Sequence, residues 1–203
     1  MHLVPTQEEV IGLLKNTGAL RYGHFEYPNG LHGNEYLQVA LAMRYYQHAK
    51  TLSVGLSRLV RANPEIRAII SELSIVTPAT GGLPVAYGVS EALRSHQVYW
   101  AEEAPEGGLR FRQFLELVPG EKVLLVDDIL RSGKKLTQLK DLVLRCGGEV
   151  VGLAVVVYQP TPATPDFSPL PFYYLAKLEG TYYRDAAACE LCRAGVPLQK
   201  VWV

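Results

Sequence analysis

The sequence has only three cysteines, no excess of either charge and no long apolar run. An odd number of cysteines argues against a disulfide framework and favours a reducing compartment. The first ten residues, MHLVPTQEEV, lack a basic region followed by an apolar stretch and so do not resemble a signal peptide. Apolar runs such as residues 150–158 are far too short to cross a bilayer. We therefore expect a cytoplasmic protein without a membrane partner.

The net charge is balanced, with 20 Lys and Arg residues against 20 Asp and Glu residues. No overall field therefore attracts nucleic acid, and we expect no nucleic-acid partner. A site for a small anion would have to be built from particular residues and backbone groups. Hydrophobic residues make up 48% of the 203 residues, which favours a single domain over residues 1–203 with a sizeable core.

Short apolar segments alternate with helical patterns in the second half of the sequence. Thr6 and Glu9 form a capping-box pattern before a short helix, and residues 18–34 read as a Gly- and aromatic-rich connector. Helices are predicted over 35–48, 52–62, 82–95 and 132–146, and strands over 74–77, 97–102, 109–117, 123–129, 150–158 and 172–178. The alternation predicts an α/β fold with a mostly parallel central sheet flanked by helices.

The segment VLLVDDILRSGKK, residues 123–135, carries the strongest functional signal. Its apolar strand runs into Asp127 and Asp128, and paired carboxylates at a strand end can accept hydrogen bonds from ribose hydroxyls or hold the hydration shell of a divalent metal. The following turn leads into a helix whose first amides and dipole form an anion site. There Ser132 adds a hydroxyl and Gly133 permits close approach. Diol acceptors beside a phosphate cradle predict a site for a ribose 5-phosphate.

An ordinary alternative explains each of these features separately. The segment could be a strand followed by a helix whose N-cap is Ser132, with solvated charges around it. That interpretation fits the constellation as a whole poorly.

The segment resembles the phosphoribosyl pyrophosphate signature of type I phosphoribosyltransferases. This resemblance implies that Asp127 and Asp128 hold the ribose and that the turn holds the 5-phosphate. The turn residues are Arg131, Ser132, Gly133, Lys134 and Lys135. The family also implies phosphoribosyl pyrophosphate and a base as small-molecule substrates, Mg²⁺ as cofactor and a homodimer. We expect Mg²⁺ to bridge pyrophosphate and ribose oxygens, without a direct protein ligand.

Three further stretches are similar to orotate phosphoribosyltransferases. VTPATGGLPVA resembles the loop that contacts pyrophosphate, which implicates Thr80, Gly81 and Gly82. TGALRYGHFEYPNGLHGNEYLQ resembles the opening of that subfamily, which implies a small N-terminal hood over the base and a role for Phe25. CELCRAGVPLQK resembles a C-terminal segment of some members. Residues 1–50 and the C-terminal segment are therefore expected to form the hood.

The resemblance implies transfer of a phosphoribosyl group to a base, with orotate favoured, but departures from the family pattern keep other bases as alternatives. The expected mobile loop, residues 100–114, has Glu103 where an Arg is expected; Arg110 and Arg112 either supply the missing charge or face solvent. Thr137 stands where the family has an Arg that reads the orotate carboxylate, so either a nearby cation compensates or the base differs. The alternatives are a phosphoribosyltransferase for another base and a non-catalytic binding protein.

Cys189 and Cys192 are separated by two residues, a spacing found in zinc sites. A structural zinc site needs four ligands, and the sequence offers no second pair with suitable spacing. We therefore interpret the two cysteines as non-metal residues.

Overall fold

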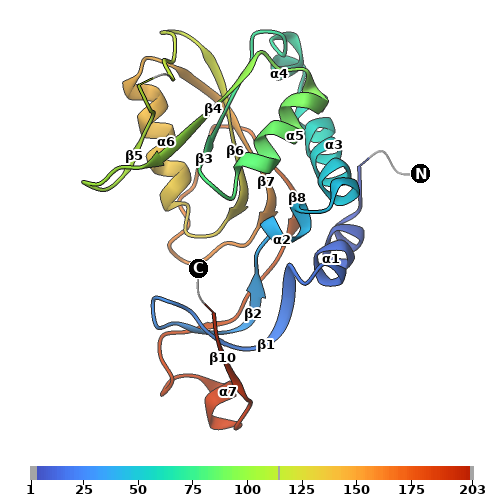
Figure 1. The fold of residues 1–203 in the computed structure, drawn as a ribbon, viewed down its shortest axis with the longest axis vertical. Coiled ribbons are helices and arrows are strands. Elements are labelled where there is room, and N and C mark those ends of the chain that lie inside the picture. Colours follow the sequence, from blue (N-terminus) through green and yellow to red (C-terminus); the bar gives the residue numbers. More distant parts are fainter. Residues whose placement is uncertain (1–3, 114, 202–203) are drawn as a thin grey trace.

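A computed structural model describes residues 4–113 and 115–201 and contains a six-stranded main sheet (Figure 1). Its strands lie in the order β5-β4-β3-β6-β7-β8 and are parallel except for β5. They are β3 (Ser74–Pro78), β4 (Gln97–Glu103), β5 (Leu109–Arg110), β6 (Lys122–Leu130), β7 (Glu149–Tyr158) and β8 (Phe172–Lys177). The predicted fold class, a mostly parallel sheet flanked by helices, is confirmed.

Helices cover both faces of this sheet (Figure 1). On one face lie α1 (Gln7–Asn16), α3 (Tyr46–Ala62) and α5 (Leu83–Leu93), with the short α4 (Pro64–Ala68) after α3; on the other lies α6 (Lys134–Arg145). Strand β6 supplies both cores, because Leu124 and Val126 face the first group of helices and Val123 and Leu125 face α6. Burial on both faces explains why this strand is continuously apolar.

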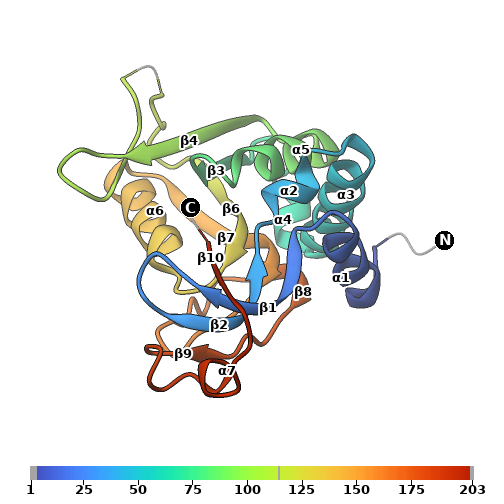
Figure 2. The same ribbon diagram turned by 60° about the horizontal axis from the view of Figure 1, so that its bottom comes forward.

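A second, smaller sheet contains residues from both ends of the chain (Figure 2). We call it the hood sheet; its order is β10-β1-β2-β9, and β10 is parallel to β1. The strands are β1 (Leu20–Glu26), β2 (His32–Leu37), β9 (Tyr182–Tyr183) and β10 (Leu198–Lys200), and the short helices α2 (Ala40–Met43) and α7 (Glu190–Arg193) adjoin it. The C-terminal segment therefore pairs with the first hairpin of the protein.

Three local predictions are wrong. The supposed connector 18–34 contains β1 and the start of β2, and the supposed helix 35–48 contains the end of β2, α2 and the start of α3. The glycines in this segment led to the prediction of a connector instead of a hairpin. Gly33 lies within β2, where a Cβ would be 2.7 Å from the Tyr27 hydroxyl. The strand expected over 109–117 has only two residues, and residue 114 lies outside the described part. The capping box of Thr6 and Glu9 at the start of α1 is confirmed.

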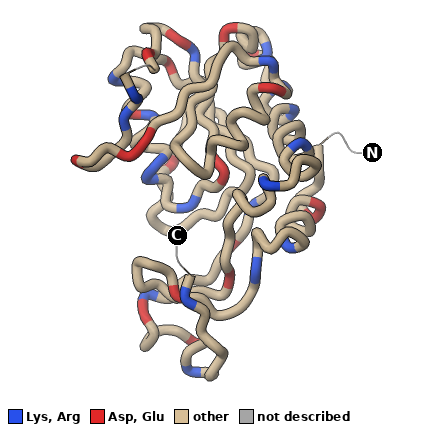
Figure 3. The backbone as a smooth tube through the Cα atoms, in the orientation of Figure 1, with Lys and Arg blue, Asp and Glu red and all other residues tan. Residues whose placement is uncertain are grey.

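The two charge signs are interspersed along the chain (Figure 3). Within residues 4–113 and 115–201, no helix is both long and apolar enough to span a bilayer.

Candidate active site

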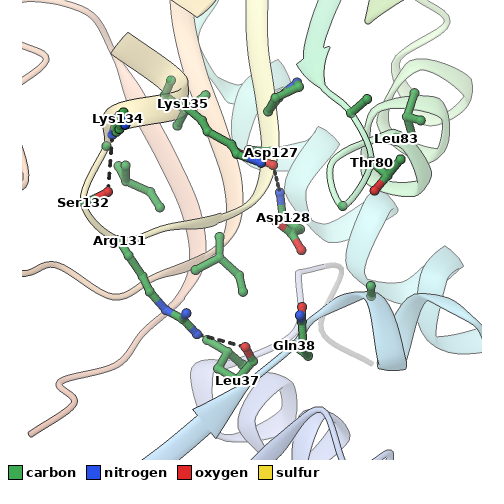
Figure 4. Close-up of a pocket in the computed structure, with 18 of the residues that line it drawn as sticks. Leu37, Gln38, Thr80, Leu83, Asp127, Asp128, Arg131, Ser132, Lys134 and Lys135 are labelled. Atoms are coloured by element: carbon green, nitrogen blue, oxygen red, sulfur yellow. Dashed lines mark hydrogen bonds between the residues drawn. The ribbon is translucent and has the colours of Figure 1, made fainter. Parts of the chain in front are cut away.

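A cleft of about 1190 Å³ opens where β3 and β6 end (Figure 4). These strands are neighbours, but the chain continues from β3 to β4 on one side and from β6 to β7 on the other. This is the topological switch point at which open parallel sheets bind ligands. The cleft is lined mainly by residues 78–81, 127–136, 36–38 and 40–41. The predicted phosphoribosyl pyrophosphate residues all line it except Gly82.

Asp127 and Asp128 both line the cleft. Asp127 is buried, and one of its carboxylate oxygens accepts the Asp128 amide hydrogen at 2.8 Å. Burial and then repulsion by Asp128 raise the pKa of Asp127 well above its usual range, and burial also raises the pKa of Asp128. The Lys135 side chain runs toward Asp127 and partly offsets this effect (Figure 4). Two partly desolvated carboxylates thus face a site that would accept hydroxyl donors or a cation.

The turn before α6 depends on Gly133. Its φ of 72° lies in the left-handed region, and a Cβ there would lie 2.5 Å from Cδ of Pro165. Gly133 is also the N-cap of α6, so the first amides of a twelve-residue helix point toward the cleft without intrahelical partners. Ser132 is exposed beside them, and its Oγ is 3.5 Å from the Lys134 nitrogen (Figure 4). This arrangement can bind an anion through backbone donors.

The loop after β3 packs directly against the acid pair. A Cβ on Gly81 would lie 2.9 Å from an Asp128 carboxylate oxygen. A Cβ on Gly82 would lie 2.9 Å from an Asp127 carboxylate oxygen and 2.1 Å from Oγ1 of Thr77. A side chain at either position would force the acids or Thr77 to move, and Thr80 lies at the cleft on the opposite side of the acids from the turn (Figure 4).

The side chain of Arg131 does not lie in the phosphate turn where the sequence predicted it. Only its backbone lies there; its guanidinium reaches the hood sheet, where Nη2 donates to the carbonyl of Leu37 at 2.9 Å (Figure 4). Nε donates to Oε1 of Gln159 at 2.6 Å, and the Gln159 amide donates to the buried carboxylate of Glu35. Sequence reasoning missed Glu35, Leu37 and Gln159, because the chain brings them together only in the folded state.

Four other predicted residues lie outside the cleft lining. Phe25 is buried in the hood sheet against the ring of Tyr36, at 5.9 Å between ring centroids, and Tyr36 rather than Phe25 faces the cleft. Thr137 lies in the first turns of α6, and its amide donates to the Gly133 carbonyl. Arg110 and Arg112 are exposed near β5, and Nε of Arg112 binds Glu102 at 2.6 Å. Their predicted roles in base binding and catalysis stay predictions.

Glu103, which stands where the family has an Arg, lines the cleft and forms an ion pair with Lys135, Oε1 to Nζ at 3.4 Å. The pair is exposed, so solvent screens it strongly. Lys135 therefore lies between Glu103 and Asp127 at the cleft, and its predicted role in phosphate binding stays a prediction.

The sequence alone did not reveal two further side chains beside Cys189 and Cys192. The structure places a second pair of potential ligands, His24 and His32, beside them. The two histidines lie on β1 and β2, eight residues apart in the sequence, which differs from the about three to five residues between the histidines of common zinc motifs.

Comparison with known proteins agrees with this architecture. The sequence pattern of the phosphoribosyl transferase domain matches residues 46–169. The chain is 36% identical over 191 residues to the orotate phosphoribosyltransferase of Acidithiobacillus ferrooxidans, covering 94% of this chain and 93% of that protein. It is 36% identical over 182 residues to that of Carboxydothermus hydrogenoformans, covering 90% of each.

Solved structures share the fold. A phosphoribosyltransferase from Corynebacterium diphtheriae superposes with a TM-score of 0.61 at 25% identity, covering 84% of this chain and 95% of that one. The orotate phosphoribosyltransferase of Mycobacterium tuberculosis, solved with inorganic phosphate, gives a TM-score of 0.63 at 21% identity, covering 85% and 95%.

Proposed function

This chain belongs to the phosphoribosyl transferase domain family, and from that premise we propose that it transfers the 5-phosphoribosyl group of phosphoribosyl pyrophosphate to orotate. The products are orotidine 5'-monophosphate and pyrophosphate. The observation that carries the proposal is the convergence of the acid pair, the α6 turn and the Gly81–Gly82 loop on one cleft at the switch point of the sheet.

Each part of the cleft suits one part of the donor substrate. The carboxylates of Asp127 and Asp128 accept hydrogen bonds from the two ribose hydroxyls. The amides from Ser132 to Lys135 and the α6 dipole bind the 5-phosphate. The loop at Thr80, across the acid pair from that turn, meets the pyrophosphate.

The reaction breaks the bond from the ribose anomeric carbon to pyrophosphate and forms a bond from that carbon to a ring nitrogen of the base. Positive charge grows on the ribose ring as negative charge grows on the leaving group. The chain supplies little covalent chemistry, and its contribution is to position the two substrates and stabilise these charges. Arg110 and Arg112 would reach the leaving group only if the β4–β5 region closes over the cleft.

Arg131 supports orotate as the base. The family's carboxylate-reading Arg is replaced by Thr137, but the guanidinium of Arg131 lies at the boundary between the turn and the hood sheet. It holds the Leu37 carbonyl there, next to Tyr36 and Gln38, which line the cleft. An always-charged donor at this wall suits a base that bears a carboxylate.

The residues of the cleft also fit Mg²⁺. The carboxylates of Asp127 and Asp128 are hard oxygen donors, and their raised pKa values mark a site where a nearby cation would relieve repulsion. Asp128, the less buried of the two, would accept hydrogen bonds from the water shell of the ion. Bound Mg²⁺ would neutralise charge on the pyrophosphate.

An activity screen tests the proposal. Orotate, uracil, adenine and hypoxanthine would each be incubated with phosphoribosyl pyrophosphate and Mg²⁺, and pyrophosphate release measured. We expect turnover with orotate alone. Turnover only with another base would overturn the orotate assignment, whereas calorimetric binding of phosphoribosyl pyrophosphate without any product would favour a non-catalytic binding protein.

A homodimer and a cytoplasmic location are further parts of this proposal. Sedimentation equilibrium would measure the mass of the protein in solution, for which we expect twice that of one chain. Fractionation of the native cells would test the location.

A further inference from the structure

Four side chains with metal-binding atoms meet where β1 and β2 adjoin α7, which lies at the end of the hood away from the main sheet (Figure 1). His24 and His32 come from β1 and β2. Cys189 directly precedes the short α7, and Cys192 lies within it. His24, His32 and Cys189 are buried, and Cys192 is half-buried. Their ligand atoms all lie within 4.8 Å of one another.

Four of the six distances among the ligand atoms are close to those of a tetrahedron around one ion, and the other two are within 4.8 Å. The Nε2 atom of His24 is 3.0 Å from Nδ1 of His32, 3.5 Å from the Cys189 sulfur and 3.4 Å from the Cys192 sulfur. The Cys192 sulfur is also 3.4 Å from Nδ1 of His32. With zinc–nitrogen bonds of about 2.05 Å and zinc–sulfur bonds of about 2.3 Å, tetrahedral geometry places nitrogen atoms about 3.4 Å apart and nitrogen about 3.6 Å from sulfur.

Hydrogen bonding alone does not account for the cluster. The Nδ1 atom of His24 lies 2.8 Å from the Val196 carbonyl oxygen, so it must carry the proton that it donates there. The Nε2 atom of the neutral ring then has one lone pair, yet three potential partners surround it within 3.5 Å. A single ion at the centre would use this lone pair and those of the other three atoms together.

The contact with Val196 is also the support that metal-binding histidines usually have. A ring nitrogen that donates to a backbone carbonyl fixes the tautomer and orients the opposite nitrogen toward the metal. Here the carbonyl belongs to the same C-terminal segment as the two cysteines, so one segment supplies both two ligands and the support of a third.

We propose that His24, His32, Cys189 and Cys192 bind one Zn²⁺ ion. Two thiolates and two imidazoles in tetrahedral geometry are a common ligand set of structural zinc sites. Four protein ligands leave no open position, so the site is structural. It fastens the C-terminal segment to the β1–β2 hairpin.

The zinc site also bears on the cleft. Beyond the cysteines the chain forms β10 beside β1, and the Val201 amide donates to the Glu26 carbonyl at 3.0 Å. Val201 lines the cleft. Zinc bound at the hood sheet therefore fixes the position of β10. Through β10 it also fixes Val201, which forms part of the cleft wall on the side where the base is expected to bind.

Metal analysis of the protein purified without a histidine tag tests the proposal. We expect one zinc ion per chain by plasma mass spectrometry, and its loss in Cys189→Ser and Cys192→Ser. Cys146→Ser is the matched control, because Cys146 lies at the end of α6 and belongs to the other core. The control should keep its zinc, whereas the two site variants should melt roughly 5 to 10 °C lower.

A spectroscopic measurement keeps the test decisive if the site variants do not fold. Replacing zinc by Co²⁺ in the wild-type protein should give the visible bands of a tetrahedral ion and thiolate-to-cobalt charge transfer. The proposal is overturned if the wild-type protein holds no zinc after exposure to it and gives no such bands. It is equally overturned if thiol titration finds Cys189 and Cys192 joined as a disulfide in the active protein.

Discussion

At the scale of single residues, Asp127 and Asp128 are two neighbouring carboxyl groups whose charged forms are both disfavoured when no ligand is bound. Burial and mutual repulsion raise the pKa of Asp127, and burial raises that of Asp128. Such a pair costs stability and suits a ligand that brings hydroxyl groups or a cation. Binding and stability should therefore respond in opposite directions when one acid is removed.

The first prediction concerns binding. Asp128→Asn removes a charged acceptor of a ribose hydroxyl, and we expect the dissociation constant for phosphoribosyl pyrophosphate to rise about 10- to 100-fold with the fold intact. Isothermal calorimetry measures it. Asp141→Asn, an exposed substitution of the same kind on α6, should leave it unchanged. Equal affinity of Asp128→Asn and the wild type would mean that the ribose lies elsewhere.

The second prediction concerns pH. The folded protein binds protons at this pair more tightly than the unfolded chain, so each raised pKa lowers the unfolding free energy as the pH rises above about 3.9, the ordinary pKa of aspartate. Asp128→Asn removes one of the acids and the repulsion on the other. Urea unfolding should therefore find this variant increasingly more stable than the wild type as the pH rises from 4 to 7. A difference that does not change with pH would contradict the repulsion.

At the scale of elements, the turn before α6 depends on one backbone conformation. In Gly133→Ala the left-handed φ costs about 1 kcal/mol, and the contact with Pro165 adds roughly 1 to 3 kcal/mol. Gly107→Ala is the matched control, because Gly107 also has a positive φ, of 94°, but open space at its Cβ position. Urea unfolding should show the larger loss in Gly133→Ala, and phosphate binding should weaken only there. Equal losses would rule out the packing against Pro165.

The main-sheet elements could be predicted from the sequence because their patterns are local. The apolar run of β6 and the amphipathic pattern of α6 each arise from neighbours in the sequence, and so does the acid pair that follows the strand. The hood elements could not be read this way. Only two residues separate the end of β2 at Leu37 from the start of α2 at Ala40. The apolar residues from Leu37 to Leu41 therefore fit one continuous helix as well as they fit the end of a strand followed by a turn.

At the scale of the whole molecule, Arg131 connects the main sheet to the hood sheet. Arg131→Met would remove the donor to the Leu37 carbonyl and to Oε1 of Gln159, and we expect a loss of about 2 to 4 kcal/mol of unfolding free energy and a higher KM for orotate. Urea unfolding and steady-state kinetics measure the two effects. Arg67→Met, an exposed change on α4, should stay within about 0.5 kcal/mol of the wild type. An unchanged KM would place the orotate carboxylate away from Arg131.

Both contacts across the molecule lay beyond sequence reasoning for the same reason. Arg131 and Leu37 are 94 residues apart, and the Cys189 sulfur and His24 ring are 165 residues apart. Their proximity depends on how β2 and β10 dock, which only the folded chain determines. The cysteine pair was visible in the sequence, but its partners are two histidines whose spacing is set by a hairpin.

The parallel pairing of β10 with β1 also orders events during synthesis. His24 and the Val196 carbonyl are 172 residues apart, which a ribosome needs roughly 10 to 30 seconds to cover. Throughout this interval one edge of β1 has no strand beside it, and such an edge can pair with other chains. The main sheet can fold on the nascent chain, whereas the wall of the cleft at Val201 is completed last. The growing protein is thus exposed to aggregation through its first hairpin until its last strand is made.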